Sequence, residues 1–222
     1  LLWIKQDYKS MIVELKKIAV SDPENKLSSY YNALCMCKLE YDTKITIPAI
    51  QEEIRKNEPD CYLFNALGEQ YIRGGLKDFA EKWFSKAVII NQDYKDAYYN
   101  LIEIYKETGN NQGILEAYKN FLRIKFDLVK NIEYIQLLYR LKYYSETIIE
   151  IQKILPSLPE NYKLLRILAN SYRFMKNWDN AIMIYRQVLV KDPDSEIVLQ
   201  SLVYCLDQGG RILSAIELLD GA

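Results

Sequence analysis

Apolar residues recur three and four positions apart along most of this 222-residue chain, with polar and charged residues between them. This spacing gathers apolar side chains on one face of a helix, so it predicts amphipathic helices and not strands. The chain has only 8 Gly and 6 Pro. Glycine pairs at Gly74-Gly75 and Gly209-Gly210 stand between apolar runs, where they predict turns. We therefore expect an all-α protein.

A 34-residue period orders these helices, and its clearest copies are residues 61–94 and 162–195. Both copies carry a large apolar residue at place four, a Leu and a small residue at places seven and eight, and a Tyr at place eleven. Both also carry an Ala at place twenty and an aromatic residue at place twenty-four. In the first copy these residues are Phe64, Leu67, Gly68, Tyr71, Ala80 and Phe84.

The length and the anchor residues of this period resemble the tetratricopeptide repeat, which folds as a helix, a tight turn and a second helix. The resemblance implies a right-handed α-solenoid of stacked antiparallel helix pairs. Stepping along the chain predicts half a repeat with a linker, a divergent repeat, four repeats and a shortened one, all within one solenoid domain. Their ranges are 1–27, 28–60, 61–94, 95–127, 128–161, 162–195 and 196–222. In the divergent repeat we expect the second helix to begin near Pro48.

The two ends of the chain do not read as polar caps, which solenoids normally need. The pattern begins inside a repeat, and the final helix is apolar, so we expect a piece of a longer protein. Apolar faces at Leu1 to Ile18 and at Leu213 to Leu219 leave self-association through the solenoid ends open as a further hypothesis.

Histidine is absent from the chain, which removes the usual general base near neutral pH and the commonest metal ligand. No Gly-rich phosphate loop followed by Lys is present. Of the four cysteines, Cys35 and Cys37 lie two apart, about 200° around a helix, so they cannot readily chelate together. We interpret all four as buried thiols and expect no catalytic residue, cofactor or metal site. The prediction is a protein that is not an enzyme.

The net charge of the chain indicates whether a nucleic acid or a protein is the expected partner. With 29 Lys and Arg against 30 Asp and Glu, the formal net charge is −1, whereas nucleic-acid binders usually carry a basic excess. The 19 Tyr residues are therefore interpreted mainly as packing anchors. RNA binding, as in the related pentatricopeptide proteins, stays a minor alternative because a local basic patch can be hidden in a neutral total.

The resemblance also implies that the first helices of successive repeats line a concave groove, which binds a protein or peptide partner. The residues that it places in this groove are Tyr62, Asn65, Glu69, Tyr99, Glu103, Gln136, Tyr139, Lys163, Arg166, Asn170, Arg173 and Tyr204. Along the chain, the first residues of this set are acidic and aromatic, and those in the repeat at 162–195 are mostly cationic. Arg side chains there can bind an acidic group of the partner.

Arg166 and Asn170 resemble part of the carboxylate clamp of chaperone-binding tetratricopeptide domains. Arg stands where that clamp has Lys, Ser201 occupies the Asn place of the next repeat, and a third repeat would lie beyond Ala222. A solvated helix face is therefore the favoured interpretation, and chaperone binding is a minor hypothesis.

These observations predict a noncatalytic scaffold that binds another protein within a multiprotein assembly. The alternative is an accessory or regulatory segment of an enzyme whose catalytic domain lies outside these residues. No run of residues is apolar enough to span a membrane. The cysteines are interpreted as free thiols, which favours a reducing compartment such as the cytoplasm. A targeting signal outside this sequence is the alternative.

Overall fold

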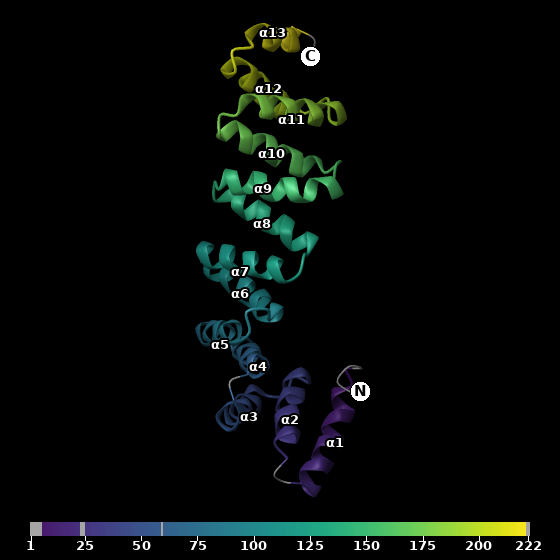
Figure 1. The fold of residues 1–222 in the computed structure, drawn as a ribbon, viewed down its shortest axis with the longest axis vertical. Coiled ribbons are helices and arrows are strands. Elements are labelled where there is room, and N and C mark those ends of the chain that lie inside the picture. Colours follow the sequence, from purple (N-terminus) through teal and green to yellow (C-terminus); the bar gives the residue numbers. More distant parts are fainter. Residues whose placement is uncertain (1–5, 23–24, 59, 221–222) are drawn as a thin grey trace. The chain divides into compact units, whose positions relative to one another are not determined.

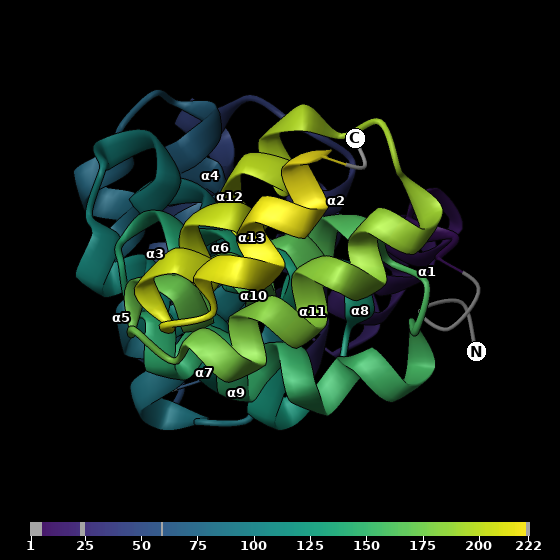
Figure 2. The same cartoon turned by 90° about the horizontal axis from the view of Figure 1, so that it is seen from above.

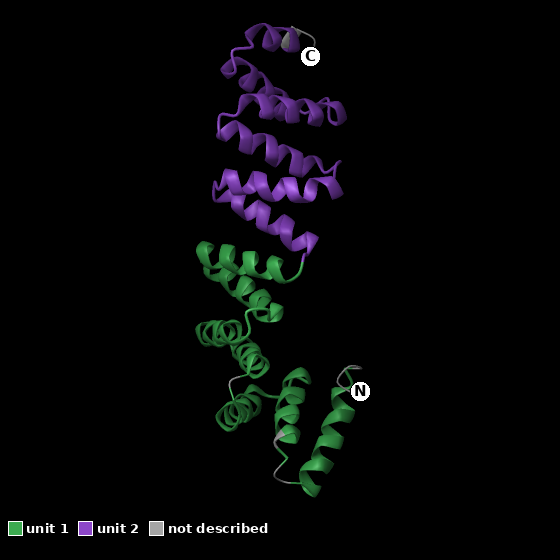
Figure 3. Cartoon of the chain, viewed as in Figure 1, with its two compact units in different colours: residues 1–125 green, residues 126–222 purple. Residues whose placement is uncertain are grey.

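The computed structural model describes residues 6–22, 25–58 and 60–220, and these residues form helices joined by short turns, without a strand. The all-α prediction is confirmed. They divide into two compact units, residues 1–125 and 126–222 (Figure 3). Leu1 and the side chain of Leu219, which bound the predicted apolar end faces, lie outside the described residues. None of the described helices is long and apolar enough to cross a membrane.

Unit 1 contains seven of the described helices, and each packs against the next one along the chain (Figure 1). Their bounds are α1 Tyr8–Ser21, α2 Lys26–Lys38, α3 Thr43–Lys56, α4 Cys61–Arg73, α5 Lys77–Ile90, α6 Lys95–Thr108 and α7 Asn111–Ile124. Helix α2 also contacts α4, so the first helices of two successive pairs lie side by side.

Unit 2 continues the same alternation, with each helix again packed against its successor (Figures 1 and 2). Its helices are α8 Leu128–Arg140, α9 Tyr144–Ile154, a short 3-10 helix Leu155–Ser157, α10 Tyr162–Phe174, α11 Trp178–Lys191, α12 Glu196–Gln208 and α13 Ile212–Asp220. One hydrophobic core runs through the unit, from Ile135 on α8 to Ala215 on α13.

One turn geometry recurs between the two helices of each pair. A residue with positive φ ends the first helix, and the next residue donates its backbone N–H to the carbonyl five positions earlier, at 2.7 to 3.1 Å. This bond closes the end of a helix by satisfying one of its last carbonyls. The positive-φ residues are Glu40, Gly75, Gly109, Lys142, Lys176 and Gly210. The divergent pair α2–α3 thus shares its turn with the regular pairs.

Small residues let paired helices approach closely. Gly68 on α4 faces Phe84 on α5, and a Cβ at Gly68 would lie only 2.5 Å from the Phe84 ring. Ala80, Phe84 and Ala181 are fully buried, as their anchor places predict. The period therefore identifies the residues that pack the two helices of a pair together.

The second helix of the divergent pair begins earlier than the sequence suggested. Helix α3 starts at Thr43, because the Asp42 carboxylate caps it by accepting the Lys44 N–H at 2.9 Å. Pro48 lies inside α3, where it has no N–H to donate to the preceding turn. The expectation that this helix begins near Pro48 was wrong, because a good capping residue upstream outweighs the proline signal.

All four cysteines are buried and free, so their interpretation as buried thiols is confirmed. Cys35 packs with Ile12 and Leu15 of α1, whereas Cys37 packs in the separate core that contains Ile50 of α3. The two thiols thus face different neighbours, as a spacing of two on a helix predicts.

Candidate functional site

The first helices of the pairs carry the residues that the sequence placed in a groove. We call the surface of α8, α10 and α12 the first-helix face of unit 2, and that of α2, α4 and α6 the first-helix face of unit 1. Tyr139, Asn170, Arg173 and Tyr204 come from three helices of unit 2 and lie close enough to interact. Gln136 on α8 is exposed.

Asn170 connects helices within this cluster. Its Oδ1 accepts a hydrogen bond from the Tyr185 hydroxyl of α11, and its side chain also hydrogen-bonds to Tyr139 of α8. Burial raises the pKa of Tyr139, while this bond and the charges of Arg173 and Arg166 oppose the rise. Asn170 therefore holds together three helices of unit 2, a role that the sequence pattern did not reveal.

Arg173 lies half-buried between two aromatic rings. Its guanidinium carbon is 4.7 Å from the centre of the Phe174 ring and 5.9 Å from that of Tyr204. Its Nε is buried and has no hydrogen-bond partner among the described residues. The Tyr204 ring is held edge-on by Trp178, at 6.1 Å between centres. A buried donor without a partner is costly, so this guanidinium is suited to receive an acceptor from a bound molecule.

Positive charge on this face is not neutralised within the described part of the chain. Lys163 and Arg166 are exposed, and neither they nor Arg173 form an ion pair with any described carboxylate. Burial raises the pKa of Tyr185 to about 12, and the charge of Arg173 opposes that rise. The positive charge of these three α10 residues is therefore not balanced by an ion pair within the described part of the chain.

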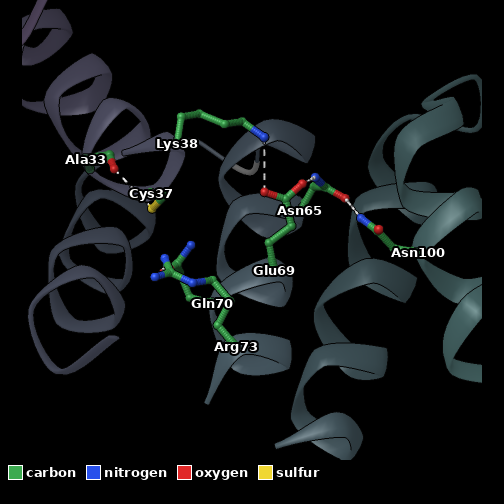
Figure 4. Close-up of polar contacts among 8 residues, drawn as sticks. All are labelled: Ala33, Cys37, Lys38, Asn65, Glu69, Gln70, Arg73 and Asn100. Carbon is green, nitrogen blue, oxygen red and sulfur yellow. Dashed lines mark hydrogen bonds and ion pairs between the residues drawn. The ribbon is translucent and has the colours of Figure 1, made fainter. Parts of the chain in front are cut away.

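The first-helix face of unit 1 is organised differently, because its polar residues bind one another (Figure 4). Asn100 Nδ2 of α6 donates to Asn65 Oδ1 of α4 at 3.0 Å, and Asn65 Nδ2 donates to Glu69 Oε1 at 2.9 Å. Lys38 of α2 completes the chain with an ion pair to Glu69 Oε2 at 3.1 Å. Asn65 is only 4% exposed. Asn65 and Glu69 therefore connect helices, and their acceptor atoms are already occupied.

Aromatic residues flank this polar chain. Tyr62 is half exposed and lies edge-on to Tyr94, with ring centres 5.1 Å apart. Burial raises the pKa of Tyr94, and the charges of Asp96 and Glu69 raise it further. Tyr99 is 44% exposed on α6. These rings offer apolar contact beside an acidic environment.

Glu103, the other predicted groove residue on α6, pairs with Lys106 one turn along the same helix, at 3.0 Å. This pair lies on the surface, so it adds little to stability.

A cavity of about 340 Å³ opens beside this polar chain, and apart from Glu69 its lining residues are ones that the sequence analysis did not name as groove residues. Gln70 is 1% exposed and Cys37 is buried, whereas Arg73 reaches from the end of α4 toward α2 (Figure 4). The only signal in the sequence was a polar Gln70 within the apolar stripe of α4. Among the described residues, no group of three Cys, Asp or Glu side chains could hold a metal ion.

Comparison with solved structures shows which known proteins share this architecture. The C-terminal part of a tetratricopeptide-repeat protein from Cytophaga hutchinsonii is 15% identical, with 98% of this chain and 91% of that one covered and a TM-score of 0.60. YrrB, described as a tetratricopeptide-repeat protein with an unusual peptide-binding site, is 12% identical, with 84% and 96% covered and a TM-score of 0.58. A tetratricopeptide-repeat protein from Parabacteroides merdae is 13% identical, with 99% and 93% covered and a TM-score of 0.53.

These structural likenesses establish the fold. The sequence also matches a family model, over a single repeat. The tetratricopeptide-repeat profile matches residues 165–195, which span most of α10 and all of α11. The chain therefore contains a tetratricopeptide repeat at these residues and has the fold of tetratricopeptide-repeat proteins. The matched repeat carries Arg166, Asn170 and Arg173, so the most regular tetratricopeptide repeat is also the most cationic part of the predicted groove. The search of curated proteins found no match to the sequence of this chain.

Proposed function

We propose that this chain is a noncatalytic scaffold, and that each of its first-helix faces binds an extended segment of a partner protein within an assembly. The observation that carries the proposal is the un-neutralised cluster of Arg166, Arg173 and Tyr204 on unit 2. The proposed repeats are the six helix pairs from α2–α3 to α12–α13, preceded by α1 as a half repeat.

Arg173 and Tyr204 suit peptide recognition on physical grounds. A guanidinium offers several donors in a fixed plane, and hydrogen bonds that it makes to a carboxylate are about twice as strong as neutral ones. Because Tyr204 and Phe174 already hold the Arg173 group in place, little side-chain entropy is lost on binding. The half-exposed Tyr204 ring adds apolar contact. An acidic residue beside an apolar one is therefore the segment that this face of unit 2 fits best.

Asn170 is assigned a different role from the one that the clamp resemblance implied. Its Oδ1 is engaged by Tyr185 and its side chain also bonds to Tyr139, so it positions the face and does not grip the ligand alone. The net charge of −1 favours a protein over a nucleic acid as partner.

An affinity capture from native extract tests the proposal. The bait is the full chain, and its variant carries Arg166→Glu, Asn170→Ala and Arg173→Glu on α10. The expected result is a partner retained by the native bait and lost by a variant whose helical circular dichroism is unchanged. A catalytic domain as the captured partner would favour the alternative of an enzyme accessory segment.

A charge-matched variant on α11 controls for nonspecific electrostatics. Arg186→Glu, Gln187→Ala and Lys191→Glu change the net charge by the same amount at exposed positions of a second helix. This control is expected to retain the partner. Loss of the partner from both variants would mean that total charge, and not the first-helix face of unit 2, governs binding.

A further inference from the structure

The cavity on the first-helix face of unit 1 is an open pocket lined by side chains from three first helices and one second helix. Its volume of about 340 Å³ lies within the range of small ligand sites. The lining residues are Cys37, Lys38, Glu40, Glu69, Gln70, Ile72, Arg73, Phe84 and Asn100. Its walls therefore combine polar groups with the apolar surfaces of Ile72, Phe84 and Cys37.

The acceptor atoms of Glu69 and Gln70 beside this cavity are already engaged. Both carboxylate oxygens of Glu69 are occupied, one by Asn65 and one by Lys38. The Oε1 atom of Gln70 accepts from Thr46 Oγ1 at 2.9 Å and from Arg73 Nη1 at 3.1 Å. The same side chain carries an amide Nε2 group, which can donate hydrogen bonds to a ligand. A ligand that accepts hydrogen bonds therefore suits this cavity better than one that donates them.

The charges around the cavity also favour a ligand that accepts hydrogen bonds and carries negative charge. Lys38 is paired with Glu69, but Arg73 bonds only to neutral oxygens, namely Gln70 Oε1 and the Glu40 backbone carbonyl at 2.8 Å. Glu40 also lines the cavity, where it is exposed and makes no ion pair among the described residues. No carboxylate among the described residues pairs with the Arg73 guanidinium. Its positive charge is therefore available to a ligand in the cavity.

We propose that this cavity receives the carboxylate side chain of a Glu or Asp residue from the bound peptide segment. The carboxylate accepts hydrogen bonds from Arg73, Lys38 and the Gln70 amide, while the methylene groups of the side chain contact Ile72 and Phe84. The proposal rests on the proposed function, since it assumes a peptide on the first-helix faces, and it adds a second point of recognition on unit 1.

A selection from random peptides tests the cavity directly. The peptides are attached through their C-termini, so that no free terminal carboxylate competes, and the full chain is the selecting protein. The expected result is enrichment of Glu or Asp at one fixed position relative to an apolar residue. Replacing that acidic residue by its amide in a recovered peptide is expected to weaken binding at least about tenfold in calorimetry.

Two variants locate the effect at the cavity. With Arg73→Gln, the acidic preference disappears and the acid and amide peptides bind about equally. Lys38→Gln, at a half-exposed position that folding tolerates more readily, is expected to reduce the same preference. Arg55→Gln removes an exposed arginine of α3 that pairs with Glu52, and it is expected to leave the preference unchanged.

The outcomes separate this inference from the proposed function. Peptides enriched without an acidic position, or an acidic preference that survives both Arg73→Gln and Lys38→Gln, would overturn the assignment of the cavity and leave peptide binding intact. A selection that enriches no peptide on the folded chain would overturn both.

Discussion

Replacing Gly68 by Ala tests whether the close contact between α4 and α5 holds unit 1 together. A Cβ at this position would lie 2.5, 2.7 and 2.8 Å from three atoms of the Phe84 ring. Ordinary contacts to a Cβ are 3.4 to 4 Å, so the ring must move by nearly 1 Å. Phe84 is fully buried in a close-packed interior, so a movement of its ring also displaces the side chains that pack against it.

Two opposing effects set the size of the change. Overpacking a close-packed core costs about 1 to 3 kcal/mol. Ala in place of Gly within a helix gains about 1 kcal/mol. Because three ring atoms of a fully buried side chain are involved, we expect the overpacking to prevail and the free energy of unfolding to fall by about 1 kcal/mol.

Gly74→Ala is the matched control. A Cβ there would meet only backbone oxygens at 3.5 and 3.6 Å, and the φ of −79° suits Ala. This substitution is expected to raise stability by about 0.4 to 1 kcal/mol, by restricting the unfolded chain. The assay is urea unfolding followed by far-ultraviolet circular dichroism, in which the two variants should move the midpoint in opposite directions.

Phe84→Leu supplies a second check, through a double-mutant cycle. With the ring removed, Gly68→Ala should cost less than it does in the native chain. A Gly68→Ala variant as stable as the native protein, or more stable, would refute the claim that small residues set the spacing of this helix pair.

Three further predictions follow from burial, backbone geometry and ionisation. Ala181→Leu places a larger side chain at a fully buried site and should cost roughly 1 to 3 kcal/mol in urea unfolding, whereas Met183→Leu, at a half-exposed site of the same helix, should change little. Lys176→Gly should raise the free energy of unfolding by about 1 kcal/mol, because the native φ of 59° is strained for Lys and not for Gly; a lower unfolding midpoint would contradict this. Burial raises the pKa of the Cys37 thiol to about 12 and that of Cys205 to about 11, both from 9.0. The neutral thiols therefore contribute their full stability below about pH 9 and lose it as the pH rises toward 12, so the unfolding midpoint should fall across that interval, and less so in a variant with both thiols replaced by Ala.

The sequence alone was sufficient for the features that depend on periodicity. Helix type, turn positions and the buried anchors Gly68, Ala80 and Phe84 follow from which face of each helix must be covered. The opposite orientations of Cys35 and Cys37 follow from helix geometry in the same way. These properties are local or repeat at a fixed interval, so a single sequence reveals them.

The polar arrangement could not be predicted in the same way. Asn65 bonds to Asn100, 35 positions away, and Gln70 bonds to Thr46, 24 positions away. Which donors remain unused depends on such distant partners, and the sequence does not show them. On unit 1, the groove residues Asn65 and Glu69 therefore proved to be bonded to each other. The guanidinium without a carboxylate partner beside them belongs to Arg73, which the repeat pattern did not single out.

The central claim is that peptides bind on the first helices of the pairs, and site-specific photo-crosslinking tests it most directly. A benzophenone amino acid is placed at Tyr62 or Tyr204 on first helices, and at Phe79 or Met183 on second helices, with a peptide recovered from the selection. The four side chains are matched in exposure at 51%, 48%, 53% and 51%, so access alone cannot decide the result. We expect crosslinks from Tyr62 or Tyr204 and none from the second-helix positions. Crosslinks from Phe79 or Met183 instead would contradict the account.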